Sequence, residues 1–178
     1  MLRLAGALLV LVASFFVTLG ALRYWHSSPL TEPAYDAAAL PHLRIGQSLD
    51  FRQNRSALLS GWAAPESGGV WSDGQAAFIG FVVDGSPAKR VVLRASVFKE
   101  QKVQVWSGTK KLAEYHLKDS PVELAIPLDD VNVGNGTPVV LGFYLPDASS
   151  PAKQKLSQDT RELALLVTFL QISSEGAS

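Results

Sequence analysis

The sequence predicts an all-β fold, an antiparallel sandwich preceded by one transmembrane α-helix. Beyond residue 25, short strand-like runs follow one another at intervals of about ten residues, and clusters of Gly, Pro, Asn and Asp separate them. No stretch in this part of the chain combines a helical spacing of apolar residues with helix caps. Many short strands with regular turn signals are typical of β-sandwiches and barrels.

Composition narrows the classes of function that the chain can have. The 178 residues include 16 basic and 16 acidic side chains, so the formal net charge is zero. A protein that binds nucleic acid needs a basic excess to displace counterions, so nucleic acid is not an expected partner. The chain has no cysteine, which excludes disulfides, thiol catalysis and Cys-ligated zinc.

Residues 4–22 form an uncharged apolar run. As a helix, this run would span close to about 30 Å, the thickness of the hydrocarbon core of a bilayer. Arg3 precedes it, and Arg23 and Trp25 follow at the depth of the membrane interface. We predict an uncleaved anchor; the alternative is a signal peptide cut after Gly20, for which the run is unusually long. Either way, the rest of the chain crosses the membrane.

The sequence divides into four predicted parts. They are a transmembrane anchor at residues 1–25, an extracytoplasmic linker at 26–45, a β-sandwich domain at 46–173 and a disordered tail at 174–178. The domain is long enough for one hydrophobic core and too short for two. Its predicted strands cover residues 48–53, 57–61, 75–83, 90–97, 101–106, 111–117, 122–126, 138–145 and 162–172. In the last of these, four residues could also share a helical face: Leu163, Leu166, Phe169 and Leu170. The sequence from Val167 to Phe169 nevertheless favours a strand.

Residues 58–74 stand out between two predicted strands. They contain two of the four tryptophans, several glycines, one proline and two carboxylates. We expect a long loop of specified shape, and such loops often have a functional role.

Two separated patterns lead to a resemblance. The first is formed by Gly61, Trp62, Pro65, Glu66, Gly69, Trp71, Ser72, Asp73 and Gly74, and the second by Ser150, Pro151, Ser157, Asp159, Arg161 and Leu163. Together they resemble the jelly-roll (carbohydrate-binding-like) module that is appended to some bacterial membrane glycosyltransferases and related envelope polysaccharide proteins. The chain departs from that family at Ser67, Gly68 and Ala164, and it carries no glycosyltransferase of its own.

The resemblance implies an antiparallel jelly-roll sandwich and a cellular context. It implies a single-pass protein of the bacterial inner membrane, with its domain in the periplasm beside an inner-membrane glycosyltransferase or a polysaccharide exporter. We therefore expect a non-catalytic accessory subunit that contacts the enzyme, the emerging glycan, or both. The alternative is a free-standing periplasmic carbohydrate-binding or adhesion module.

The candidate glycan-binding or partner-binding residues are Trp62, Glu66, Trp71, Asp73 and Arg161. The two tryptophans could stack on the apolar face of a sugar, or they could fill the end of the core. The two carboxylates could flank a glycosidic bond as catalytic acids do, or they could bind backbone N–H groups of the loop. Arg161 could bind an acidic ligand, or it could form a structural ion pair with Asp159.

The sequence does not predict a catalytic centre, a metal site or a cofactor. It has no Gly-x-Ser-x-Gly elbow around a serine nucleophile. His116 has no second histidine near it in sequence. Asp129, Asp130 and Asn132 lack the alternating oxygen ligands of a strong calcium site.

Overall fold

The computed structural model describes residues 28–85, 88–134 and 136–174. The predicted anchor at residues 1–25 lies outside the described residues, as does the predicted tail from residue 175 onward. Within the described ranges, the only helical element is the short 3₁₀ turn η1 (Ala37–Ala39), and no helix is long and apolar enough to cross a membrane.

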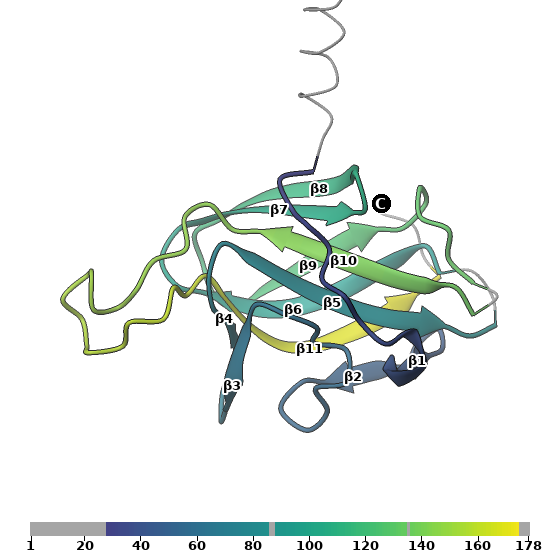
Figure 1. Ribbon diagram of the computed structural model, residues 1–178, viewed down its shortest axis with the longest axis horizontal. Coiled ribbons are helices and arrows are strands. Elements are labelled where there is room, and N and C mark those ends of the chain that lie inside the picture. The colour runs from purple at the N-terminus through teal and green to yellow at the C-terminus, as the bar shows by residue number, and fades with distance from the viewer. Residues whose placement is uncertain (1–27, 86–87, 135, 175–178) are drawn as a thin grey trace, which may run out of the picture.

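The described residues form eleven strands in two packed sheets (Figure 1). The strands are β1 (His42–Leu43), β2 (Ser48–Asp50), β3 (Trp62–Glu66), β4 (Gly69–Ser72), β5 (Ala76–Val83), β6 (Arg90–Val97), β7 (Gln101–Ser107), β8 (Lys110–Leu117), β9 (Val122–Pro127), β10 (Pro138–Tyr144) and β11 (Leu165–Ser173). One sheet has the order β1-β5-β10-β7-β8, and the other has the order β3-β4-β11-β6-β9, with β2 also paired to β11.

The strand pairing is nested from the outside inward. β4 pairs with β11, β5 with β10, β6 with β9 and β7 with β8, each antiparallel. The chain therefore behaves as one long hairpin wound across two sheets, which is the topology of a jelly-roll. The predicted all-β jelly-roll is confirmed, with one addition: β1 pairs with β5 in parallel.

The core lies between the two sheets and follows the alternation of the strands. Its largest fully buried side chains are Phe51, Phe81, Phe143, Leu43, Ile79, Leu93, Leu124, Ile126, Leu128, Leu141, Leu145 and Leu165. Successive side chains of a strand point to opposite faces, so every second residue of β5, β6 and β10 contributes to this layer. Truncating one of these phenylalanines to alanine typically costs about 3–5 kcal/mol.

The structure corrects the prediction between residues 57 and 74. Residues 57–61 are not a strand, and the expected long loop is the hairpin of β3 and β4. Gly61 and Gly69 have φ angles of +78° and +145°, which side-chain-bearing residues rarely adopt. A Cβ atom at Gly69 would lie 2.5 Å from the carbonyl oxygen of Val167. The glycines, which usually indicate a loop, here let a hairpin lie against β11.

Residues 28–40, which belong to the predicted linker, pack on the outer face of the five-stranded sheet. We call this segment the N-terminal strap; it crosses β10 and β5 in Figure 1. A Cβ at Gly142 would lie 2.7 Å from Cδ1 of Leu30, and one at Gly80 would lie 3.0 Å from Cδ2 of Leu40. Each strap leucine thus sits over a glycine of the sheet, and Leu40 is only 4% exposed.

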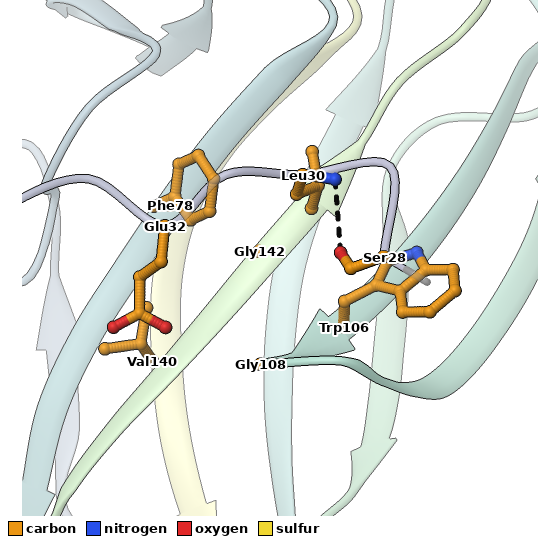
Figure 2. A pocket seen from close by; sticks show the side chains of 8 residues that line it. All are labelled: Ser28, Leu30, Glu32, Phe78, Trp106, Gly108, Val140 and Gly142. Atoms are coloured by element: carbon orange, nitrogen blue, oxygen red, sulfur yellow. Dashed lines mark hydrogen bonds between the residues drawn. The ribbon is translucent and has the colours of Figure 1, made fainter. Parts of the chain in front are cut away.

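The strap buries apolar side chains that would otherwise face solvent. Phe78, Val82 and Trp106 point away from the core, yet they are 6%, 2% and 8% exposed. A cavity of about 10 Å³ remains beneath the strap, beside Trp106 and Leu30 (Figure 2). The indole N–H of Trp106 is buried there without a hydrogen-bond partner in the described part of the chain. A space of this size holds about one water molecule.

Candidate functional site

The structure brings together the two segments that the sequence singled out. The β3–β4 hairpin lies against the residues that lead into β11, and backbone groups join them. Asp73 accepts a hydrogen bond through Oδ1 from the backbone N–H of Glu162 at 3.0 Å. The buried hydroxyl of Ser72 accepts from the N–H groups of Ala164 and Leu165, at 3.2 and 3.0 Å. The paired patterns of the sequence therefore correspond to one structural unit.

Arg161 is held between two carboxylates. Its Nη2 lies 2.8 Å from Oε1 of Glu66 and 2.6 Å from Oδ2 of Asp159. Hydrogen bonds from the Arg161 side chain and backbone hold the pKa of Asp159 below its ordinary value. Arg161 thus joins the tip of the hairpin to the loop before β11, which is the structural role that the sequence allowed.

Trp62 packs toward the core. Its indole N–H donates to the carbonyl oxygen of Phe78 at 2.8 Å, and its ring meets Phe143 edge-to-face, with centroids 6.3 Å apart. Of the two roles that the sequence left open for Trp62, this geometry corresponds to filling the end of the core.

Trp71 has a different environment. Val70 and Ser72 point inward, so Trp71 projects from the outer face of the six-stranded sheet, where it is half-buried. Phe98 supports its ring edge-on, with centroids 6.4 Å apart and an interplanar angle of 90°. Within the described residues, no hydrogen bond is made by the indole N–H of Trp71, which leaves this donor available to a ligand.

The sequence analysis missed the rest of this outer face, which we call the open face. Its members are side chains of β4, β6 and β11 that lie opposite one another in the strand register. On β11 they are Leu166, Phe169, Gln171 and Ser173. Their partners are Trp71 on β4 and Ser96, Arg94, Val92 and Arg90 on β6. All are half-buried except Arg94, which is exposed. No described residue of the strap lies on this face.

The centre of the open face combines an aromatic ring with charges. The guanidinium carbon of Arg94 lies 4.4 Å from the ring centroid of Phe169. Arg94 also donates to Glu123, with Nη2 2.6 Å from Oε1. A β-bulge around Thr168 turns Phe169 outward. This bulge explains why Leu166 and Phe169, three positions apart, share one face of the strand, as they would on a helix.

The two candidate catalytic carboxylates are both bound within the protein. Glu66 pairs with Arg161, and Asp73 ties the hairpin to Glu162. Asp129 and Asp130 pair with Lys89 and Lys110, at 3.5 and 2.8 Å. Among the residues that the structure describes, no group of three His, Asp or Glu side chains is placed to hold a metal ion.

No protein-family model and no curated protein sequence matches this chain. The chain is similar to solved structures of low identity. A family 6 carbohydrate-binding module is 10% identical, with 76% of this chain and 98% of that chain covered and a TM-score of 0.43. The module CsCBM6-3 from Clostridium stercorarium, solved in complex with cellobiose, is 11% identical, with coverage of 74% and 96% and a TM-score of 0.42.

A further similar structure is an enzyme. The acetyl xylan esterase Est2A of the rumen bacterium Butyrivibrio proteoclasticus is 13% identical, with a TM-score of 0.45; 72% of this chain matches 32% of that one. Similarities at this level assign no function to the chain. The features that bear on function are the exposed side chains of the open face and the strap that covers the opposite face.

Proposed function

We propose that this jelly-roll is a non-catalytic carbohydrate-binding module and that it binds glycan on its open face. The observation that carries the proposal is the geometry of Trp71. Its ring is half-exposed, Phe98 packs against it edge-on, and its N–H has no hydrogen-bond partner among the described residues. A rigid aromatic face stacks on the C–H face of a pyranose, while an indole N–H donates to a hydroxyl.

The distribution of polar groups supports the same surface. Ser96, Gln171 and the Arg94–Glu123 pair accompany Trp71 on the open face and offer both donors and acceptors. Sites for small ligands typically combine apolar contact area with a few placed polar groups of this kind. By contrast, the strap covers the apolar part of the opposite outer face.

The test is glycan binding by the full chain in detergent, measured against a panel of soluble polysaccharides by calorimetry. We expect Trp71→Ala to lower the affinity for the best-bound polysaccharide by about tenfold or more, because buried tryptophan contacts dominate many interfaces. The matched control is Tyr144→Ala, which removes a half-buried aromatic ring from the outer face of the other sheet. Equal binding by the Trp71 variant and the unaltered chain would contradict the proposal, as would no binding to any member of the panel.

A second proposal concerns location: the module is the membrane-anchored accessory subunit of a bacterial inner-membrane glycosyltransferase or polysaccharide exporter. Five residues separate the apolar run at 4–22 from the start of the strap at residue 28. The six residue steps from residue 22 to residue 28 reach at most about 22 Å. A strap packed on the sheet would therefore keep the jelly-roll close to the membrane surface. Co-purification of a multi-span synthase or exporter in mild detergent would support this proposal, and recovery of the chain alone would leave only the first.

A further inference from the structure

A groove lies on the open face, at the far end of β11 from Trp71. It has a volume of about 280 Å³. Its lining residues are Ile45, Gly46, Arg90, Val92, Gln171, Ile172, Ser173 and Ser174. The turn before β2 forms one wall, and the outward side chains of β6 and β11 form the floor. The volume is near the lower end of the range for small-molecule sites.

The groove and Trp71 belong to one line of side chains. Leu166 pairs with Trp71, and Gln171, five positions further along the same strand, pairs with Val92 in the groove. The β-bulge takes up one of these positions, because the partner strand spans only four positions from Ser96 to Val92, so the two ends lie about 13 Å apart. Phe169 and Arg94 lie between these two ends. A ligand that touches both ends must therefore be longer than a disaccharide.

The lining of the groove suits a sugar ring. Gln171 donates through Nε2 to the carbonyl oxygen of Gly46 at 3.3 Å, which leaves its Oε1 as an acceptor. Ser174 adds an exposed hydroxyl, while Val92 offers an apolar floor. No carboxylate is present among these lining residues. The site therefore fits a neutral or uronic-acid unit and gives no attraction to a cation.

We infer that the groove is a second sugar subsite, and that the open face binds an internal stretch of a linear glycan running along β11 from Trp71 to Gln171. This inference rests on the proposed glycan-binding function and extends it from a single contact to a chain-length requirement.

The experiment compares short and long probes on the full chain in detergent. Disaccharides and hexasaccharides of glucose, xylose and galacturonic acid are titrated against the unaltered protein and Val92→Phe. The phenylalanine fills the groove from a half-exposed position on a central strand, where an aromatic residue is well tolerated. The control variant is His116→Phe, which adds the same ring to an exposed position on β8, in the other sheet.

In the unaltered protein, we expect the hexasaccharide of the preferred sugar to bind at least about tenfold more tightly than its disaccharide. Val92→Phe should remove this advantage and leave disaccharide binding, which depends on Trp71, unchanged; His116→Phe should change neither. If Val92→Phe keeps the full preference for the hexasaccharide while Trp71→Ala loses binding, the second subsite is overturned and the proposed function stands. If no probe binds the unaltered protein, the proposed function itself fails.

Discussion

The outer face of the five-stranded sheet is covered, and that of the six-stranded sheet is open. Under the strap, Phe78, Val82 and Trp106 are nearly as buried as the core, so they serve packing. On the open face, Trp71 and Phe169 remain half-exposed and are oriented by a neighbouring ring or a guanidinium. An aromatic side chain on a sheet is therefore not informative by itself. What decides its role is whether another segment of the chain lies over it.

The largest expected effect tests the close contact between the β3–β4 hairpin and β11, the two elements that carry the open face. Gly69→Ala places a Cβ 2.5 Å from the backbone oxygen of Val167, at a φ of +145°. The new Cβ is fixed by the backbone of β4, and the oxygen is fixed by the backbone of β11, so the clash cannot be relieved without moving a strand. We therefore expect a loss of about 3 kcal/mol in the free energy of unfolding. The control is Gly74→Ala, which has a φ of +106° and open space around its Cβ. Denaturant titration should show the smaller loss for the control; equal losses would mean that backbone strain alone is responsible.

The next effect tests the cover itself. Leu40→Ala removes a strap side chain that is 4% exposed, and we expect it to cost about 2 kcal/mol. The variant should also bind more of a dye specific for exposed apolar surface, because the outer face of β5 around Gly80 loses part of its cover. Leu156, at 63% exposed, provides the matched control, and Leu156→Ala should change neither reading. If both leucine variants behave alike, the strap does not stabilise the fold.

A smaller effect is expected for Gly142→Ala, which also introduces a clash on the covered face. Its Cβ would lie 2.7 Å from Cδ1 of Leu30, the mobile end of a flexible side chain. We expect a loss of about 1 kcal/mol, below that of Gly69→Ala, because Leu30 can rotate away. A double-mutant cycle with Leu30→Ala measures this directly: the second substitution should relieve most of the loss. Strict additivity of the two substitutions would show that Leu30 does not sit over Gly142.

The smallest effect concerns β8, the edge strand of the five-stranded sheet, which the strap does not cover. Hydrogen bonds from Lys111 and Lys102 lower the pKa of Glu114 from 4.5 to about 2. A carboxylate with a lowered pKa in the folded state adds stability above its ordinary pKa, and this stability is lost as the pH falls through the folded value. Thermal midpoints measured between about pH 5 and pH 2 should therefore fall slightly more steeply for the unaltered chain than for Glu114→Gln. Parallel curves would show that these exposed ion pairs contribute nothing measurable.

Much of the sandwich is predictable from the sequence because its central strands are long and bounded by clear turns. The run at 90–97 coincides with β6, and its alternation between buried and half-buried residues is visible in the letters alone. The β3–β4 hairpin was not predictable as strands because its glycines and Pro65 imitate a loop. The backbone angle of Gly69 and the carbonyl of Val167, distant in sequence, explain why this position is a glycine.

The candidate site was predictable in part. The sequence singled out Trp71, and it marked residues 58–74 and the residues before the last strand as two separate patterns of one resemblance. It could not distinguish the environment of Trp62 from that of Trp71, because the difference depends on Phe143 and Phe98, which belong to other strands. The strap was also not predictable: its prolines indicate a linker, and the glycines that receive Leu30 and Leu40 lie on strands far along the chain.

The nested pairing of the strands has a consequence for how the protein is made. β11 is the last strand that the structure describes, yet it lies inside its sheet, between β6 on one side and β2 and β4 on the other. The six-stranded sheet, and with it the open face, is therefore incomplete until residues 165–173 have been synthesised and have reached the same compartment as β4. Contacts between residues so far apart in sequence form slowly. We expect the nascent domain to expose its apolar strands until β11 arrives, and a chain shortened within β11 to lose the whole sheet rather than one strand.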